Sequence, residues 1–345
     1  MDTKRVVSSV LLIVAASISQ MVAQDAQSGV SKKGTTAAPF LSIGQGARAA
    51  GMGNAFVAIA DDPTALYWNP GGLARLGGVG VAFEHTQWIA ETKYNFAGIS
   101  YSLGDYGALG VSLTLSDIGE MNVTTIEEPN GTGETFKATD IAVSVAYAIR
   151  LMNTFSIGFN PKFIHQSIWK TDGDALAIDI GILYDTPFSG FTLGMAITNF
   201  GTKMKLTGNS TLVLYDPDPI STGNNERIPA NLETEYWSLP LNFRFGVSYV
   251  APLSEDHHLV LAVDASHPSD DYESINVGGE YVFNDLIALR GGYKGLFLTE
   301  GEESFTLGLG VRQRFLGNFR IRIDYAYVDF GRLKNVQKFS LGFDF

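Results

Sequence analysis

The sequence predicts an all-β protein, a transmembrane antiparallel β-barrel of about fourteen strands with an N-terminal plug segment. Three observations lead to this prediction. Apolar and polar residues alternate with a period of two from Gly78 to Phe345, as in strands with one apolar face. Of the 345 residues, 45% are hydrophobic and 17% are charged, yet no apolar run reaches the roughly 18 residues that a membrane helix needs. The first residues have the layout of a secretory signal.

The N-terminus predicts export from the cytoplasm. Lys4 and Arg5 precede an apolar run from Val6 to Val14, and small residues follow near Ala23. This run suits a signal peptide and is too short to anchor the chain as a helix. We therefore expect residues 1–24 to be a signal peptide that is removed. The chain contains no cysteine, which excludes a lipid-anchored N-terminal Cys, a disulfide framework and a thiolate metal site.

Residues 25–76 are expected to form a flexible leader and then a plug segment. The stretch Ser42–Ala55 is dense in Gly and Ala, which lets a backbone approach a neighbouring wall closely. The sequence Asp61-Asp62-Pro63 is a start signal for a short helix over Thr64–Trp68. The sequence Asn69-Pro70-Gly71-Gly72 then ends that helix in a turn. Such small-residue packing predicts a segment that lies inside the barrel.

Residues 77–345 are expected to form the barrel itself. In the last segment Phe339, Leu341, Phe343 and Phe345 alternate with Lys338, Ser340, Gly342 and Asp344, so one face is apolar and the other small or polar. The same pattern predicts strands at Gly78–Ala90, Lys93–Leu103, Tyr106–Ile118, Ala138–Arg150, Thr154–Trp169, Asp174–Thr186, Phe191–Gly201, Leu239–Ala251, His257–His267, Tyr272–Phe283, Leu286–Gly295, Ser304–Phe315, Asn318–Phe330 and Asn335–Phe345.

The predicted connections alternate in length. Short turns such as Gly104-Asp105, Asn284-Asp285 and Leu316-Gly317 fall at one end of the barrel. The two longest connections, Gly119–Lys137 and Thr202–Ser238, fall at the other end. Short periplasmic turns and longer external loops are expected of an outer-membrane barrel with both termini in the periplasm.

A soluble antiparallel sandwich would also alternate, and it is the alternative fold. Sandwich strands are typically about five or six residues long, whereas the strands predicted here run to about eleven to thirteen, near the length that a tilted membrane strand needs. Aromatic residues near the strand ends favour the barrel because they suit a membrane interface. They are Trp88, Trp169, Tyr184, Phe188, Tyr249, Phe283 and Phe330.

The stretch from Gly46 to Ala74 resembles the N-terminal signature of the PorV/PorQ family. Members of this family are FadL-like outer-membrane proteins associated with type IX secretion. FadL relatives usually have Asn-Pro-Ala-Gly where this chain has Asn-Pro-Gly-Gly, a departure that leaves the turn feasible. The resemblance implies a bacterial outer-membrane location. The signature residues in this chain are Arg48, Gly51, Gly53, Asp61, Asp62, Pro63, Asn69, Pro70 and Gly71.

In a barrel, the alternation turns a set of charged residues inward. Burying such charges requires pairing or water, so they predict a ladder of ion pairs that holds the plug, with a selective pore as the alternative. Arg48, Asp61 and Asp62 of the plug are expected to pair with them. The candidate lumen charges are Arg244, Arg290, Arg312, Arg314, Arg320, Arg322 and Asp324, and Asp140, Lys162, Asp179, Asp264, Glu280 and Lys294 share their face.

No enzymatic activity, cofactor or metal site is expected. The sequence contains no Walker loop, no His-Glu-x-x-His and no Gly-x-Ser-x-Gly motif. His257 and His258 are adjacent, so in a strand they would point to opposite faces. The net charge of -12 argues against nucleic acid as a partner, because phosphate binding needs a basic face.

Two functions remain open. The resemblance implies an extracellular rim that receives secreted cargo proteins or secretion-system components, or helps attach secreted proteins to the surface. The loop Thr202–Ser238 would carry this role through Tyr215, Tyr236 and Trp237, because aromatics in a long loop suit partner binding; a lid without a binding role is the alternative. The second function is FadL-like uptake of a hydrophobic small molecule. The charged lumen favours the first, and outer-membrane lipid would surround the barrel in either case.

Overall fold

The computed structural model describes residues 32–218, 220, 225, 227–254, 256–298, 301–315 and 319–345. The signal peptide predicted over residues 1–24 and the turn predicted at Leu316-Gly317 lie outside the described residues. No helix in the described part of the chain is both long and apolar enough to cross a membrane. The elements are the 3₁₀ helix η1 Pro39–Ser42, α2 Ala47–Gly51, α3 Ala65–Trp68, η2 Pro70–Arg75, β1 Val79–Gln87, η3 Ile89–Glu91, β2 Lys93–Ser102, η4 Gly104–Tyr106, β3 Ala108–Asn122, β4 Thr135–Met152, β5 Phe155–Ile168, β6 Thr171–Asp185, β7 Phe191–Gly201, β8 Thr207–Gly208, η5 Asn209–Thr211, β9 Leu212–Tyr215, β10 Ile228–Asn231, β11 Asn242–Ser254, β12 His257–Pro268, β13 Ser274–Phe283, β14 Ile287–Leu296, β15 Phe305–Arg314, β16 Arg320–Asp329, η6 Gly331–Leu333 and β17 Asn335–Asp344.

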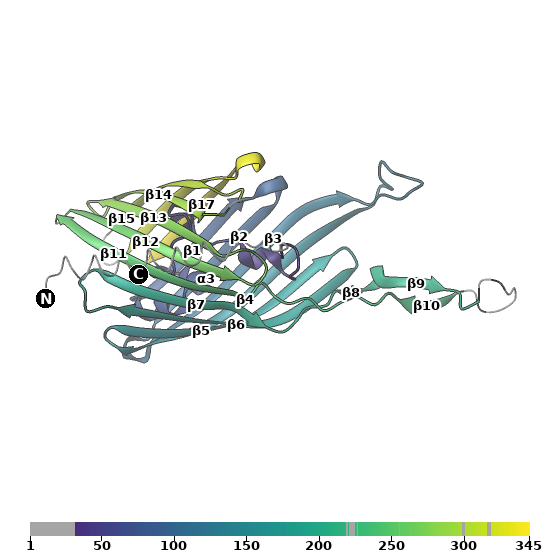
Figure 1. The fold of residues 1–345 in the computed structure, drawn as a ribbon, viewed down its shortest axis with the longest axis horizontal. Helices are drawn as coiled ribbons and strands as arrows, with labels where there is room; N and C mark the ends of the chain where they lie inside the picture. Colours follow the sequence, from purple (N-terminus) through teal and green to yellow (C-terminus); the bar gives the residue numbers. More distant parts are fainter. Residues whose placement is uncertain are drawn as a thin grey trace.

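The long strands form one closed antiparallel barrel (Figure 1). Strands pair in sequence order from β1 to β7 and from β11 to β17, β7 pairs with β11, and β17 pairs with β1 to close the ring. Within the described residues the sheet has 15 strands, and setting aside the two-residue β8, which pairs with β6 outside the ring, leaves fourteen. The predicted barrel and its number of strands are confirmed.

The outward face of the barrel is apolar and exposed. Val145, Ile323 and Phe339 are 55%, 57% and 52% exposed, although each lies within a strand. Residues beside them on the inward face, such as Asp324 and Lys338, are buried. Rows of exposed apolar side chains are unfavourable in water and suit contact with lipid.

The predicted aromatic residues at the strand ends divide into two groups. Trp169 and Phe283 are exposed, as a membrane interface requires. Trp88 and Phe330 instead pack edge to face, with ring centroids 5.1 Å apart. Phe330 is buried with Val328, which lies on the inward face of β16. The prediction of an interfacial position is therefore wrong for Phe330, because its place in the alternation turns it inward.

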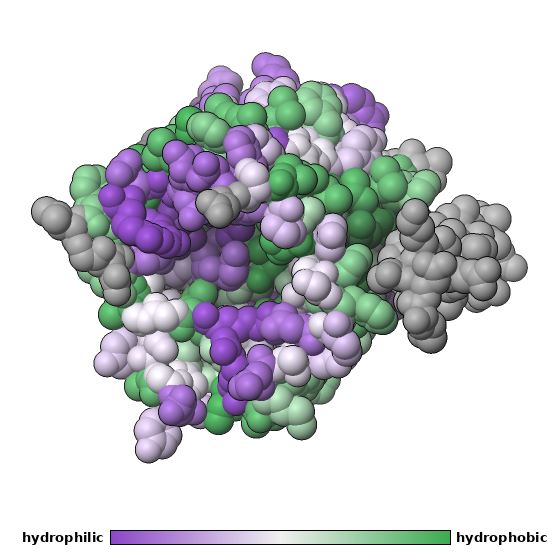
Figure 2. Space-filling model, turned by 90° about the vertical axis from the view of Figure 1, so that its left-hand side faces the viewer, coloured by the Kyte–Doolittle hydropathy of each residue, from purple (hydrophilic) through white to green (hydrophobic). Residues whose placement is uncertain are grey.

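The connections distinguish the two ends of the barrel. At the short-turn end, residues 284–286 join β13 to β14, and the C-terminal Phe345 bonds to Val79 at the start of β1. Seen from this end, hydrophilic residues gather in patches with hydrophobic residues beside them (Figure 2). At the long-loop end, residues 123–134 join β3 to β4 and residues 202–241 join β7 to β11; these two connections project furthest from the barrel (Figure 1).

Both long connections differ from their predicted bounds. The loop predicted at Gly119–Lys137 is shorter, because β3 and β4 stay paired beyond the bulge that follows Asp117. The strand predicted from Leu239 begins at Asn242, because Pro240 has no N–H to donate to a neighbouring strand. We call residues 202–241 the arm; it contains β8, η5, β9 and β10.

Residues 38–76, which we call the inner segment, run through the interior of the barrel and are mostly buried. The inner segment bonds to inward-facing groups on several sides of the wall. Ala47 N donates to Ser340 Oγ of β17 at 2.7 Å, and Phe56 N donates to Asp264 Oδ2 of β12 at 2.7 Å. On another side, Asn160 Nδ2 of β5 donates to a carbonyl of the inner segment at 2.8 Å. The segment therefore contacts the wall all along its path.

The inner segment crosses the barrel from one end to the other. Just before it, Ala37 N donates to Ser238 O of the arm at 2.9 Å, at the long-loop end. At its close, Arg75 pairs with Asp185 at 2.8 Å, at the short-turn end where β1 begins. The first described residues and the C-terminal strand β17 therefore reach opposite ends of the barrel, because the chain traverses the lumen before its first strand.

Candidate functional site

Side chains within the inner segment define its short helices. α3 begins after Thr64, whose N–H and hydroxyl donate to Asp62 Oδ1 at 2.8 and 2.5 Å. Asn69 accepts a hydrogen bond from Gly71 N at 3.1 Å and so starts η2. The Asn69 Nδ2 also donates to Ile182 O of β6 at 2.9 Å, which ties the turn to the wall. The predicted helix begins one residue later than expected, and the turn predicted at Asn69-Pro70-Gly71-Gly72 is the start of the 3₁₀ helix η2.

Two signature glycines let the inner segment meet the wall backbone to backbone. A Cβ atom on Gly53 would lie 2.7 Å from Val277 O and 2.8 Å from Tyr293 N, and Gly53 has a φ of 63° that favours glycine. A Cβ atom on Gly51 would lie 2.9 Å from the Cα of Gly308 in β15. Larger residues at either position would push the segment away from the wall.

Glycines of the wall make room for the signature prolines. A Cβ atom on Gly80 of β1 would lie 2.9 Å from Pro63 Cγ. A Cβ atom on Gly181 of β6 would lie 2.6 Å from Pro70 Cδ. Small residues on both surfaces thus allow the segment and the wall to pack closely.

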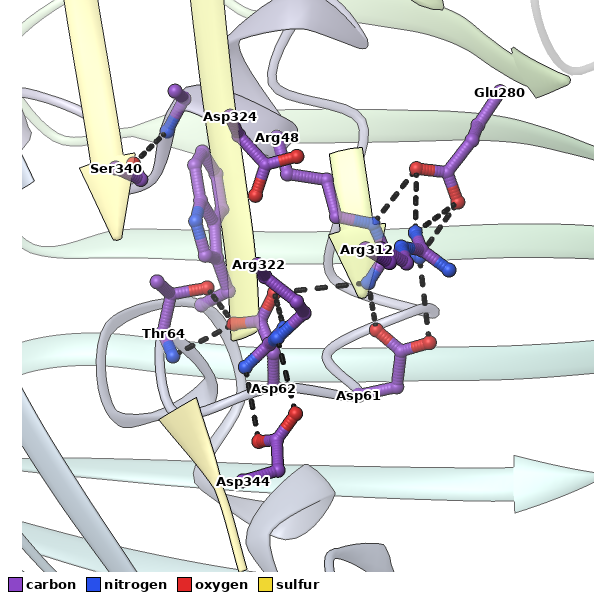
Figure 3. A network of polar contacts seen from close by, with 12 residues as sticks. Arg48, Asp61, Asp62, Thr64, Glu280, Arg312, Arg322, Asp324, Ser340 and Asp344 are labelled. Atoms are coloured by element: carbon purple, nitrogen blue, oxygen red, sulfur yellow. Dashed lines mark hydrogen bonds and ion pairs between the residues drawn. The ribbon is translucent and has the colours of Figure 1, made fainter. Parts of the chain in front are cut away.

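A buried charge network joins the inner segment to the wall (Figure 3). Its centre is Glu280 of β13, which accepts hydrogen bonds from three arginines. Arg48 donates from Nε and Nη2 at 2.9 and 2.8 Å, Arg290 from Nε at 2.6 Å, and Arg312 from Nη2 at 3.0 Å. Arg290 also donates to Asp324 at 2.7 Å. The Glu280 side chain is 1% exposed, so losing a partner would leave a buried charge uncompensated.

Arg48 extends this network towards the short-turn end. It pairs with Asp61, whose side chain is 53% exposed, and lies 3.6 Å from Asp62 Oδ2. Arg322 of β16 approaches the same Asp62 oxygen at 3.4 Å and Asp344 at 3.2 Å. Burial alone would raise the pKa of Asp62, but the nearby Arg322 and Arg48 lower this pKa below its ordinary value. Asp62 is therefore held in its charged form between two arginines.

The predicted lumen charges are not all brought together. Arg244 of β11 lies over the rings of Tyr67 and Trp68, with its guanidinium carbon 5.2 and 5.0 Å from the centroids. Arg314 of β15 and Arg320 of β16 lie opposite each other in the strand register at the short-turn end. Arg314 is exposed and Arg320 is half-buried. The network around the inner segment contains Arg290, Arg312, Arg322 and Asp324.

Sequence reasoning missed a second buried ion pair. Glu84 of β1 and Lys338 of β17 lie 2.8 Å apart, and their side chains are 1% and 4% exposed. Glu84 also accepts a hydrogen bond from Gly46 N, and Lys338 donates to Gly44 O at 2.5 Å. The signal in the sequence was a charged residue at an inward position on two strands that flank the barrel closure. This pair holds the beginning of the inner segment, as Glu280 holds its middle.

Two small cavities lie between the inner segment and the wall. One of about 20 Å³ is lined by Tyr94, Lys162 and other residues of β2 to β6. Another of about 10 Å³ lies beside Asn54 and Trp88. One water molecule needs about 10–15 Å³, so neither cavity holds an aromatic ring or an acyl chain.

The arm presents the aromatic residues of the predicted partner loop. Its strands β9 and β10 pair as a hairpin that projects beyond the barrel (Figure 1). Tyr215, Tyr236 and Trp237 are 56%, 62% and 49% exposed. Trp237 exchanges two backbone hydrogen bonds with Met204, each 2.8 Å long, which closes the base of the arm.

Comparison with known families identifies the chain. A family model described as type IX secretion system protein PorV matches residues 25–211, just over half of the chain. The chain belongs to the PorV family. In this PorV chain, the matched region contains the whole inner segment and strands β1 to β7. A search of curated proteins found no match.

The PorV chain is similar in fold to solved outer-membrane channels. The monoaromatic hydrocarbon channel CymD is 13% identical, with 87% of this chain and 96% of that one covered and a TM-score of 0.55. The Pseudomonas putida toluene transporter TodX is 12% identical, with coverage of 87% and 97% and a TM-score of 0.55. The Ralstonia pickettii toluene transporter TbuX is 12% identical, with coverage of 87% and 97% and a TM-score of 0.51. At these identities the likeness establishes the FadL-like barrel fold, and this PorV protein resides in the bacterial outer membrane.

The signature residues of this PorV-family chain hold the inner segment against the wall. The signature residues either pack against the wall, as Gly51 and Gly53 do, or bind its charged and polar groups, as Arg48 and Asn69 do. Among the residues that the structure describes, no group of three or more His, Asp or Glu side chains could hold a metal ion.

Proposed function

We propose that this PorV-family protein assists type IX secretion by binding secreted proteins or secretion-system components at its long-loop end, and that it does not act as a conduit. The observation that carries the proposal is the filled lumen. The inner segment lies across the barrel, bonded to Glu280 on one strand pair and to Glu84 on another. Material passing through would have to displace it.

The exposed arm supplies a surface for binding. Tyr215, Tyr236 and Trp237 offer large, rigid side chains that bury much apolar area when a partner covers them. The backbone hydrogen bonds between Trp237 and Met204 hold the base of the arm in place before a partner binds. Less conformational entropy is therefore lost on binding. The family match to a secretion protein directs the proposal to cargo or components of that system.

Uptake of a hydrophobic small molecule is the second candidate. The fold likeness to the hydrocarbon channel CymD and the transporter TodX supports it. Uptake through the lumen would require the inner segment to move, because the segment lies across the barrel and is bonded to Glu280 and Glu84 of the wall. Such a movement would separate Arg48 from Glu280, and breaking one buried pair costs about 3–5 kcal/mol.

Deletion of the gene separates the two candidates. Cargo proteins of the secretion system should accumulate in the periplasm of the deletion strain, while uptake of monoaromatic hydrocarbons should remain normal. Normal secretion together with lost hydrocarbon uptake would favour the second candidate. Both readouts come from the same strain, so each serves as the control for the other.

Affinity purification from outer membranes tests the arm. Replacing Tyr215, Tyr236 and Trp237 with serine should reduce co-purification of cargo or secretion-system components and leave the barrel folded. The matched control is Tyr106→Ser, because Tyr106 is 80% exposed but lies at the short-turn end. Equal recovery of partners with the triple variant and the control would argue against the arm as the docking surface.

A further inference from the structure

The described N-terminal residues are fastened to the long-loop end by contacts to two separate connections. Lys33 lies 3.5 Å from Asp271, and Thr36 Oγ1 donates to Asp270 Oδ2 at 2.8 Å, both in the loop between β12 and β13. The backbone N–H of Ala37 donates to Ser238 O of the arm at 2.9 Å. These contacts lie at the opposite end of the barrel from the C-terminus.

The next residue turns inward and begins the path through the lumen. Ala38 N donates to Gln166 Oε1 near the long-loop end of β5, at 2.8 Å. Ala38 has a φ of 51° and is fully buried, so the chain bends sharply at this point. Residues before the bend lie on the rim, and residues after it lie inside.

An apolar cluster connects the bend to the base of the arm. Ala38, Phe40 and Leu41 are buried together with Met204 and Leu239, which lie at the two ends of the arm. Tyr94 of β2, in the same cluster, donates from its hydroxyl to Phe40 O at 2.8 Å. The first residues of the inner segment therefore pack against the base of the arm.

We infer that residues 33–37 form a strap on the external face of the outer membrane, which fastens the base of the arm and is accessible from outside the cell. Short turns in outer-membrane barrels face the periplasm, so the long-loop end faces outward. Partners that approach the arm therefore also meet the strap. The inference concerns topology and holds whatever the arm binds.

Cysteine labelling tests the position of the strap, because the chain contains no cysteine and a single substitution gives a unique thiol. Intact cells that carry Thr35→Cys would be treated with a membrane-impermeant maleimide, since Thr35 is exposed. Glu127→Cys, at the long-loop end, and Asp105→Cys, at the short-turn end, are matched exposed controls. We expect Thr35→Cys to label as fully as Glu127→Cys, while Asp105→Cys labels only after permeabilisation. Labelling of Thr35→Cys only after permeabilisation would overturn the inference.

Two further variants test the fastening. Ala37→Pro removes the N–H that binds Ser238 O, whereas Ala37→Ser keeps it. Trypsin added to intact cells should cut after Lys203 and Lys205, at the base of the arm, faster in Ala37→Pro than in Ala37→Ser. Equal rates would show that the strap does not hold the arm.

If Ala37→Pro fails to assemble, a disulfide cross-link tests the placement of the strap instead. The side chains of Thr36 and Asp270 are in contact, so the double variant Thr36→Cys/Asp270→Cys should form a disulfide when an external oxidant is added. The pair Thr36→Cys/Asp105→Cys, whose second residue lies at the opposite end, is the control. Absence of the first cross-link in assembled protein would contradict the placement of the strap.

Discussion

The substitution Glu280→Gln should loosen the inner segment without changing the size of a side chain. It removes the charge that three arginines share. Breaking a buried ion pair costs about 3–5 kcal/mol, and we expect the lower end of this range because two of the arginines keep other partners. Arg48 retains Asp61 and Asp62, and Arg290 retains Asp324, at 2.7 Å. A loss of about 3 kcal/mol in local stability corresponds to roughly a hundredfold change in an opening equilibrium.

Amide hydrogen exchange of the purified protein in detergent measures this effect. The N–H groups of Ala50 and Met52 bond within the inner segment, to Gly46 O and Ala49 O. Their exchange should become roughly a hundredfold faster in Glu280→Gln, while amides of the barrel strands should change little. The control is Glu302→Gln, which removes an ion pair with the exposed Arg332 and should leave the segment unaffected. Unchanged exchange in Glu280→Gln would refute the role assigned to the network.

Other substitutions probe the packing, the acid response and the arm. Gly292→Ala should prevent the segment from seating, because a Cβ atom there would lie 2.3 Å from Gly53 N, whereas Gly291→Ala meets nothing within 4 Å; protease digestion of the segment should distinguish the two variants. The pKa of Asp62 lies below its ordinary value of 3.8, so its charge stabilises the folded segment above that pH and this contribution is lost as the pH falls through the lowered pKa. Asp62→Asn should therefore weaken exchange protection at neutral pH, with the difference from wild type disappearing under strongly acidic conditions; a constant difference at every pH would contradict this. The serine triple variant at Tyr215, Tyr236 and Trp237 should export less cargo in a complemented deletion strain than Tyr106→Ser does, and equal export would exclude a role for these rings.

The barrel could be predicted from the sequence because each strand carries its own signal. The strand predicted at Phe191–Gly201 has the same bounds in the structure, and the one predicted at His257–His267 ends one residue later. Alternation depends on neighbouring residues within a strand and on which face meets lipid. These are local properties, so the strands can be predicted without knowing which residues meet across the lumen.

The contents of the lumen could be predicted only in part. Arg48, Asp61 and Asp62 were expected to pair with the wall, but the meeting of Arg48 with Glu280 depends on how far the segment descends before it turns. That depth is set by backbone contacts such as the one between Gly51 and Gly308, which no local pattern reveals. For the same reason the pair formed by Glu84 and Lys338 was missed, since it exists only where the barrel closes on itself.

The crossing of the lumen by the chain was also beyond local signals. The leader before Ala38 is short and polar, and nothing in its composition indicates at which end of the barrel it lies. Its position follows from single contacts, such as those of Thr36 with Asp270 and Ala37 with Ser238. Contacts of this kind are long-range, and a periodic pattern contains no information about them.

Electrical recording across planar lipid bilayers tests most directly whether the inner segment fills the lumen. Purified wild-type protein should give no conductance steps above the bare membrane, because the inner segment lies across the lumen and is bonded to Glu280 and Glu84 of the wall. Gly292→Ala, which displaces the segment, should produce steps, and Gly291→Ala should not. Steady open steps from the wild-type protein would contradict a filled barrel and would make uptake through the lumen the favoured function.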